Sequence, residues 1–146
     1  MSTKNMLKSK KAISPILATL LLIVIAVAAI VVTYAWIMTY MGSATSQAGV
    51  LLSKDAVSWP TNTTIVVYVR NTGTSDATID AVYVGTSAAN LTNAAIASMN
   101  PTNGVVAANG GAIQITITYT WTNGTTYYFK VAPKVGAPLE FNIKAS

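Results

Sequence analysis

The chain has 146 residues, of which 52% are hydrophobic and only 9% are charged, against about 25% charged residues in an average protein. It contains neither cysteine nor histidine, which excludes disulfides, thiolate metal sites and most acid–base catalysis. We therefore expect a protein that is not an enzyme, with no catalytic residues, no cofactor and no metal.

Much of the positive charge precedes the first apolar segment. Lys4, Lys8, Lys10 and Lys11 have no acidic neighbour, and the other charges within the net +5 nearly cancel. A nucleic-acid-binding protein would place basic residues on its folded domain, where they can contact phosphates. Lysines before an apolar segment instead indicate a membrane protein whose N-terminus stays inside the cell. We expect no nucleic-acid partner.

Residues 13–42 are predicted to form a long hydrophobic helix. No charge occurs from Ile13 to Met41, and at about 1.5 Å per residue such a helix exceeds the roughly 20 residues that a bilayer core requires. Ser14-Pro15 suits a helix start, and Gly42 suits its end. A single-pass anchor is one interpretation. A secretory signal cleaved near Gly42–Ala44 is another, although its apolar core would be unusually long.

Residues 43–146 are predicted to form an extracellular β domain. Segments rich in β-branched and aromatic residues, separated by turn residues, occur at Ala56–Trp59, Thr63–Arg70, Ala77–Val84, Gly104–Ala107, Ala112–Trp121, Thr126–Ala132 and Leu139–Lys144. Such spacing favours an immunoglobulin-like antiparallel sandwich. The predicted fold class is therefore α+β, a long N-terminal hydrophobic helix followed by a small β-sandwich head.

Alternation within these segments predicts the core. Ile113, Ile115 and Ile117 should face inward, and Ile79, Ala81 and Tyr83 should share one face of their strand. The large core side chains are expected to be Trp59, Tyr68, Tyr83, Trp121 and Tyr127.

Two connections are predicted from local sequence. Asn123-Gly124 is a strong hairpin signal, which would join Ala112–Trp121 to Thr126–Ala132. Ala88–Met99 is ambiguous, and we interpret it as a short helix or a loop.

The junction between the leader and the helix, Lys10-Lys11-Ala12-Ile13-Ser14-Pro15-Ile16-Leu17, resembles the class III signal peptide of archaeal type IV pilins. The resemblance implies that residues 1–12 are a leader removed by a prepilin peptidase, with Lys11, Ala12 and Ile13 forming the processing site. Bacterial type IV pilins carry a glutamate at the fifth mature position. That position is Leu17 here, which fits the archaeal pattern.

The resemblance also implies a function. The chain would be a structural subunit of an extracellular archaeal pilus used for surface adhesion, a homopolymer built by the pilus assembly machinery from a precursor held in the cytoplasmic membrane. The expected filament-core packing residues are Ile16, Leu20, Ile23, Val27, Ile30 and Tyr34. An archaellin of the motility filament and a membrane-anchored surface protein with a β-sandwich ectodomain are the alternatives.

Candidate modification sites occur in the β domain. The N-x-[ST] acceptor pattern occurs at Asn62, Asn90 and Asn123, and covalent glycans there would require surface-exposed loops.

The first prediction concerns processing. We expect the mature protein to begin at Ile13, with Ala12 as the less favoured start, because the leader ends at Lys11-Ala12. N-terminal sequencing of the native protein checks this directly. A mature chain that keeps Met1 or Ser2, or that begins near Ala44, would contradict the pilin interpretation.

Overall fold

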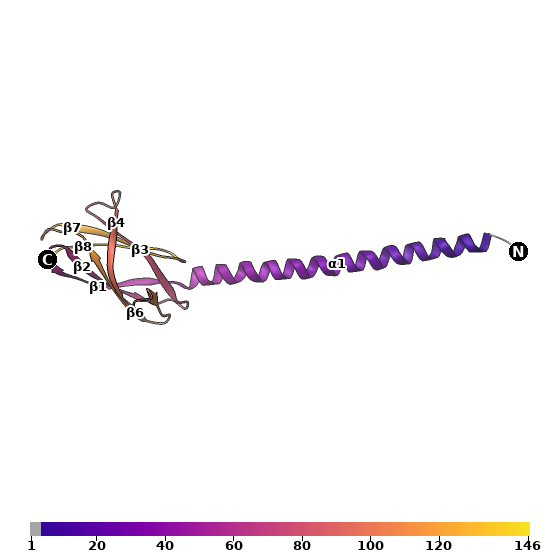
Figure 1. The fold of residues 1–146 in the computed structure, drawn as a ribbon, viewed down its shortest axis with the longest axis horizontal. Helices are drawn as coiled ribbons and strands as arrows, with labels where there is room; N and C mark the ends of the chain where they lie inside the picture. Colours follow the sequence, from indigo (N-terminus) through magenta and orange to yellow (C-terminus); the bar gives the residue numbers. More distant parts are fainter. Residues whose placement is uncertain (1–3) are drawn as a thin grey trace. The chain divides into compact units, whose positions relative to one another are not determined.

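The computed structural model describes the backbone of residues 4–146 and the side chains of residues 14–45 and 48–146. Over these residues it contains one long helix, α1 (Lys4–Gly49), and eight strands (Figure 1). The chain divides into two compact units, Met1–Ser43 and Ala44–Ser146. The predicted α+β class is confirmed.

Helix α1 extends further than predicted in both directions. It begins before Ser14 and includes Pro15, because residues 4–12 contain no glycine or other proline to stop a helix. It also continues through Gly42, the predicted helix end. A Cβ added at Gly42 would meet no atom within 4 Å, so no close contact requires a glycine there. The helix ends at Gly49, whose carbonyl accepts the N–H groups of Thr74 (2.8 Å) and Ser75 (3.1 Å). The loop that contains Thr74 and Ser75 therefore supplies hydrogen-bond donors to the carbonyl at the C-terminal end of the helix.

The strands are β1 (Leu52–Thr61), β2 (Thr64–Asn71), β3 (Ala77–Gly85), β4 (Thr92–Asn100), β5 (Val105–Val106), β6 (Gly111–Thr118), β7 (Thr126–Pro133) and β8 (Leu139–Lys144). They pair antiparallel in the order β1-β2-β6-β4-β3-β7-β8, with β5 added at the start of β3. The orders β1-β2-β6-β4 and β3-β7-β8 match the A-B-E-D and C-F-G sheets of an immunoglobulin fold. The predicted sandwich is therefore present.

Strand β4 connects the two sheets. Its first residues pair with β3, as in Val82 opposite Ala94, while its later residues pair with β6, as in Ile96 opposite Ile117. The interpretation of 88–99 as a helix or loop is wrong for residues 92–99, which belong to β4, whereas residues 88–91 form the loop before this strand. β4 is rich in alanine and asparagine, which have low strand propensity, and its two neighbours define it as a strand.

The core lies between the inner faces of the sheets. The predicted inward isoleucines Ile113, Ile115 and Ile117 are at most 1% exposed. They pack in one cluster with buried side chains of the opposite sheet, among them Phe129 and Val131. The alternating pattern of β6 thus identified its inner face correctly.

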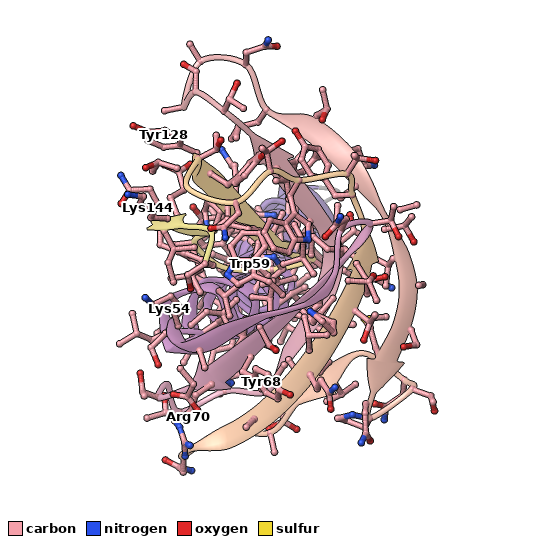
Figure 2. The ribbon with its side chains drawn as sticks, turned by 90° about the vertical axis from the view of Figure 1, so that its left-hand side faces the viewer. Lys54, Trp59, Tyr68, Arg70, Tyr128 and Lys144 are labelled. Atoms are coloured by element: carbon pink, nitrogen blue, oxygen red, sulfur yellow. The ribbon has the colours of Figure 1, made fainter. Side chains whose placement is uncertain are left out.

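Two core predictions are corrected. Tyr68 is 36% exposed, because its neighbours Val67 and Val69 on β2 take the inward positions. Figure 2 shows Tyr68 near the periphery and Trp59 among the strands. In β3, a register shift between Ile79 and Ala81 changes which residues face inward. Residues that follow the shift, such as Val82, are therefore buried in place of Ala81 and Tyr83.

The predicted hairpin at Asn123-Gly124 is also wrong. A turn is present, with Gly124 at φ 85°, but β6 pairs with β2 and β4, whereas β7 pairs with β3 and β8. The connection crosses from one sheet to the other, so a local turn signal does not establish that the flanking strands pair.

Asn71, at the end of β2, is fully buried and fully hydrogen-bonded. Its Nδ2 donates to the carbonyls of Ser75 (2.8 Å) and Val106 (3.1 Å). Its Oδ1 accepts the N–H of Gly73 (3.0 Å) and that of Leu51 (3.4 Å). One side chain therefore holds together the start of the domain, the β2–β3 loop and β5.

The second prediction concerns Asn71. We expect Asn71→Ala to lower the free energy of unfolding by about 2–4 kcal/mol, because several buried backbone groups lose their partner. Denaturant unfolding of the full chain in detergent, followed by tryptophan fluorescence, measures the change. The exposed Asn93 on β4 provides the matched control, and an equal effect of Asn93→Ala would contradict the assigned role.

Candidate assembly interface

The apolar surface of α1 is the largest chemical feature of the chain. Residues Ser14–Thr45 form a 32-residue span that contains an 18-residue stretch of mean hydropathy 3.1, and none of that stretch is buried. Large apolar side chains are exposed on every side of this helix, for example Leu21 (62%), Leu22 (69%) and Val24 (64%). A helix that is hydrophobic all round must be covered by lipid or by other protein.

The six predicted packing residues lie along this surface. Their side chains are between 55% and 67% exposed: Ile16, Leu20, Ile23, Val27, Ile30 and Tyr34. Their spacing of three and four residues places them on one helix face. The opposite face is equally apolar, so their role in packing stays a prediction.

Several threonine and serine hydroxyl groups on α1 are bonded within the helix. Thr33 Oγ1 donates to the carbonyl of Ala29 at 2.8 Å, and Thr39 Oγ1 donates to that of Ala35 at 3.0 Å. Thr19 and Ser43 bond to residues Ile16 and Thr39 in the same manner. A dry environment penalises unpaired hydroxyls, and these need no external partner. The sequence interpretation missed this role, although threonines within an apolar helix signal it.

Aromatic side chains gather near the C-terminal part of the span. At about 1.5 Å per residue, 32 residues extend roughly 48 Å, beyond the roughly 30 Å of a bilayer core. A span that starts after Lys11 would leave the core near Thr33. Tyr34, Trp36 and Tyr40 follow directly, and the rings of the last two stack with centroids 5.8 Å apart. Tryptophan and tyrosine are enriched at membrane–water interfaces, so these residues suit the outer boundary.

The processing residues Lys11, Ala12 and Ile13 belong to α1, but their side chains lie outside the described residues. Their role therefore stays a prediction.

The β domain carries few free charges. Arg70 Nη2 lies 2.8 Å from Asp55 Oδ2, and the hydrogen bond with Asp55, reinforced by its charge, raises the pKa of the guanidinium. Lys130 Nζ lies 2.9 Å from Glu140 Oε1. The domain thus presents a largely neutral surface.

Among the described residues, no group of three His, Cys, Asp or Glu side chains could hold a metal ion.

The candidate acceptors lie in exposed connections. Asn62 occupies the β1–β2 turn, Asn90 lies in the β3–β4 loop, and Asn123 occupies the turn before β7. These connections lie at one end of the sandwich, opposite the end where Leu52 begins β1. Each side chain is accessible for modification, whereas occupancy stays a prediction.

No protein-family model matches the sequence, and no curated protein matches it. The fold resembles that of archaellum proteins. The archaeal flagellum of Methanospirillum hungatei strain JF1 matches with a TM-score of 0.60 and 16% identity, covering 100% of this chain and 94% of that chain. The archaellum periplasmic stator protein FlaG from Sulfolobus acidocaldarius matches with a TM-score of 0.54 and 17% identity, covering 64% and 99%.

A complex of the archaellum periplasmic stator proteins FlaF and FlaG from the same organism also matches. Its TM-score is 0.50 at 16% identity, and the match covers 63% of this chain and 87% of that chain. At such identities the likeness shows a shared fold. The described chain therefore has the architecture found in archaellum components, a class of archaeal surface machinery.

The third prediction concerns α1. We expect Ile25→Asp to prevent assembly, because a carboxylate at the centre of the span costs about 2.5–3.5 kcal/mol on insertion scales and would be unpaired in a packed helix core. Electron microscopy of shed and cell-bound filaments measures the loss. Ile25→Leu, which keeps the apolar surface, is the control. Normal filaments from Ile25→Asp would show that this position is not in a dry core.

Proposed function

We propose that this chain is a structural, non-enzymatic subunit of an archaeal extracellular filament of the type IV pilin and archaellin kind. The observation that carries the proposal is the uncharged span Ser14–Thr45, whose side chains are exposed throughout. A surface of this size is unstable in water, since each Å2 of exposed apolar area costs about 25 cal/mol. A filament core of identical helices removes that cost outside the membrane.

The proposal describes two environments for one helix. In the precursor, lipid surrounds α1, the lysines stay inside the cell and the β domain lies outside. After extraction, copies of α1 replace the lipid. Small residues such as Ala18, Ala26 and Ala29 let helix backbones approach closely. A contact between different faces of identical subunits that does not close into a ring generates a helical polymer.

The position of Pro15 supports cleavage before Ile13. Within α1 the proline ring removes one backbone hydrogen bond and is unfavourable. In a chain that begins at Ile13, the same proline falls in the first helical turn, where its missing N–H has no partner in any case. Prepilin peptidase and an assembly machinery are therefore the proposed processing partners.

Among filaments, we favour an adhesive pilus over an archaellum. The Ser-Pro helix start and the scarcity of acidic residues, four in the chain, are the sequence features behind this preference. The likeness to the archaeal flagellum extends over the whole chain and supports the archaellin alternative to a comparable degree.

A membrane-anchored envelope protein is the second candidate. The fold likeness to the periplasmic stator protein FlaG favours it, because one apolar helix would anchor such a domain equally well. In that case α1 would stay in lipid, and the aromatic side chains Tyr34, Trp36 and Tyr40 would mark its permanent outer boundary.

The fourth prediction separates these candidates. We expect the native protein to sediment as micrometre-long filaments without detergent, with this chain as the main subunit by mass spectrometry. Recovery only as detergent-solubilised monomers from membranes would support the anchored protein. Deletion of the gene further distinguishes the filaments, since a pilus subunit would be needed for surface attachment and an archaellin for swimming.

A further inference from the structure

Two acceptor asparagines that are distant in sequence lie side by side in the β domain. The backbone N–H of Trp121 donates to the carbonyl of Asn62 at 3.0 Å, and that of Tyr119 donates to Thr63 at 3.0 Å. The β1–β2 turn that carries Asn62 is therefore tied to the connection that carries Asn123. Folding brings together two N-x-[ST] sites that the sequence separates.

Both sites lie in exposed turns, which a modifying enzyme can reach. Asn62 and Asn123 are exposed residues of turns. At the second site, Gly124 has φ 85° and open space around its Cβ position. The Gly124 N–H donates to the carbonyl oxygen of Ala145 at 2.9 Å. This hydrogen bond holds the turn against the segment that follows β8. The acceptor amide is thus presented to solvent on a supported loop.

An aromatic cluster adjoins these turns. The rings of Trp59 and Trp121 lie 4.8 Å apart at 55°, and Trp59 also contacts the ring of Tyr127 at 5.8 Å. The Trp121 Nε1–H donates to the carbonyl of Thr61 at 2.6 Å, which holds the indole in place. Both indoles are only partly buried and flank the hydrophobic core. Both residues therefore keep part of their surface exposed to solvent.

We propose that Asn62 and Asn123 form one N-glycosylation patch whose sugars pack against the indole rings of Trp59 and Trp121. The apolar C–H face of a pyranose carries partial positive charge and complements the negative face of an indole ring. Trp121 lies two residues before Asn123, so the first sugar at Asn123 would be within reach of its ring. Covering the indoles would remove their exposed area from water.

The covalent step requires a lipid-phosphate-linked oligosaccharide and a membrane oligosaccharyltransferase. The amide Nδ2 of asparagine forms a bond to the anomeric carbon, the bond from that carbon to the phosphate oxygen breaks, and the lipid phosphate leaves. One amide proton passes to a base of the transferase. The inference rests on the proposed function only in requiring that the β domain lies outside the cytoplasm.

The test begins with glycopeptide mass spectrometry of the native protein, whether it is isolated as filaments or from membranes. We expect sugars on Asn123 and Asn62. Unmodified asparagines at both positions would overturn the inference without affecting the filament proposal, because filament formation is scored separately.

Packing against the indoles is tested with the Asn62→Gln, Asn123→Gln double variant. We expect a red shift of tryptophan emission and a melting temperature about 4–8 °C lower than that of the native protein. Asn90→Gln removes an acceptor outside the aromatic cluster and should change neither value. Identical emission and melting temperature in the double variant and the native protein would overturn the packing.

A second pair of variants separates the sugar from the asparagine side chain. Thr125→Ala removes the acceptor pattern but keeps Asn123, whereas Thr125→Ser keeps both. We expect the emission shift with Thr125→Ala and not with Thr125→Ser. The same shift in both variants would show that Thr125 itself, rather than a sugar, protects the indole.

Discussion

The structure depends on one constraint, the incompatibility of a 32-residue uncharged helix with water. Backbone groups of α1 satisfy one another, and the hydroxyls of Thr33 and Thr39 bond to carbonyls one turn earlier. Such a helix is stable in lipid without any partner. Outside lipid it needs equally apolar surroundings, which identical helices would provide. The proposed function follows from this requirement, because the same surface would serve as anchor and as assembly interface.

The β domain, in contrast to α1, encloses its apolar side chains and exposes polar ones. Its apolar side chains are enclosed between two sheets, with Ile65, Val67 and Ile115 fully buried. Its surface charges are few, and two ion pairs neutralise part of them. Its buried asparagine Asn71 has all its hydrogen-bonding groups paired. The domain would therefore remain folded if the helix changed its surroundings as proposed.

Much of this architecture could be predicted from the sequence, since composition identifies the apolar helix and strict alternation identifies strands such as β8, Leu139–Lys144. Features set by tertiary pairing could not. β4 is held by two neighbours despite weak propensity, and the register shift after Ile79 reverses the faces of β3. The proximity of Asn62 and Trp121 depends on strand order. The sequence defines how far the apolar surface of α1 extends. Because this helix is apolar all round, the sequence does not identify which face would pack.

The central claim is that α1 leaves lipid and is buried against other copies of itself. A helical reconstruction of native filaments by electron cryo-microscopy tests it most directly. The account predicts a lipid-free core in which Ser14–Thr45 of neighbouring subunits are in contact, with the β domains outside. A filament held together by β domains alone, or a chain found only with α1 in lipid, would contradict it.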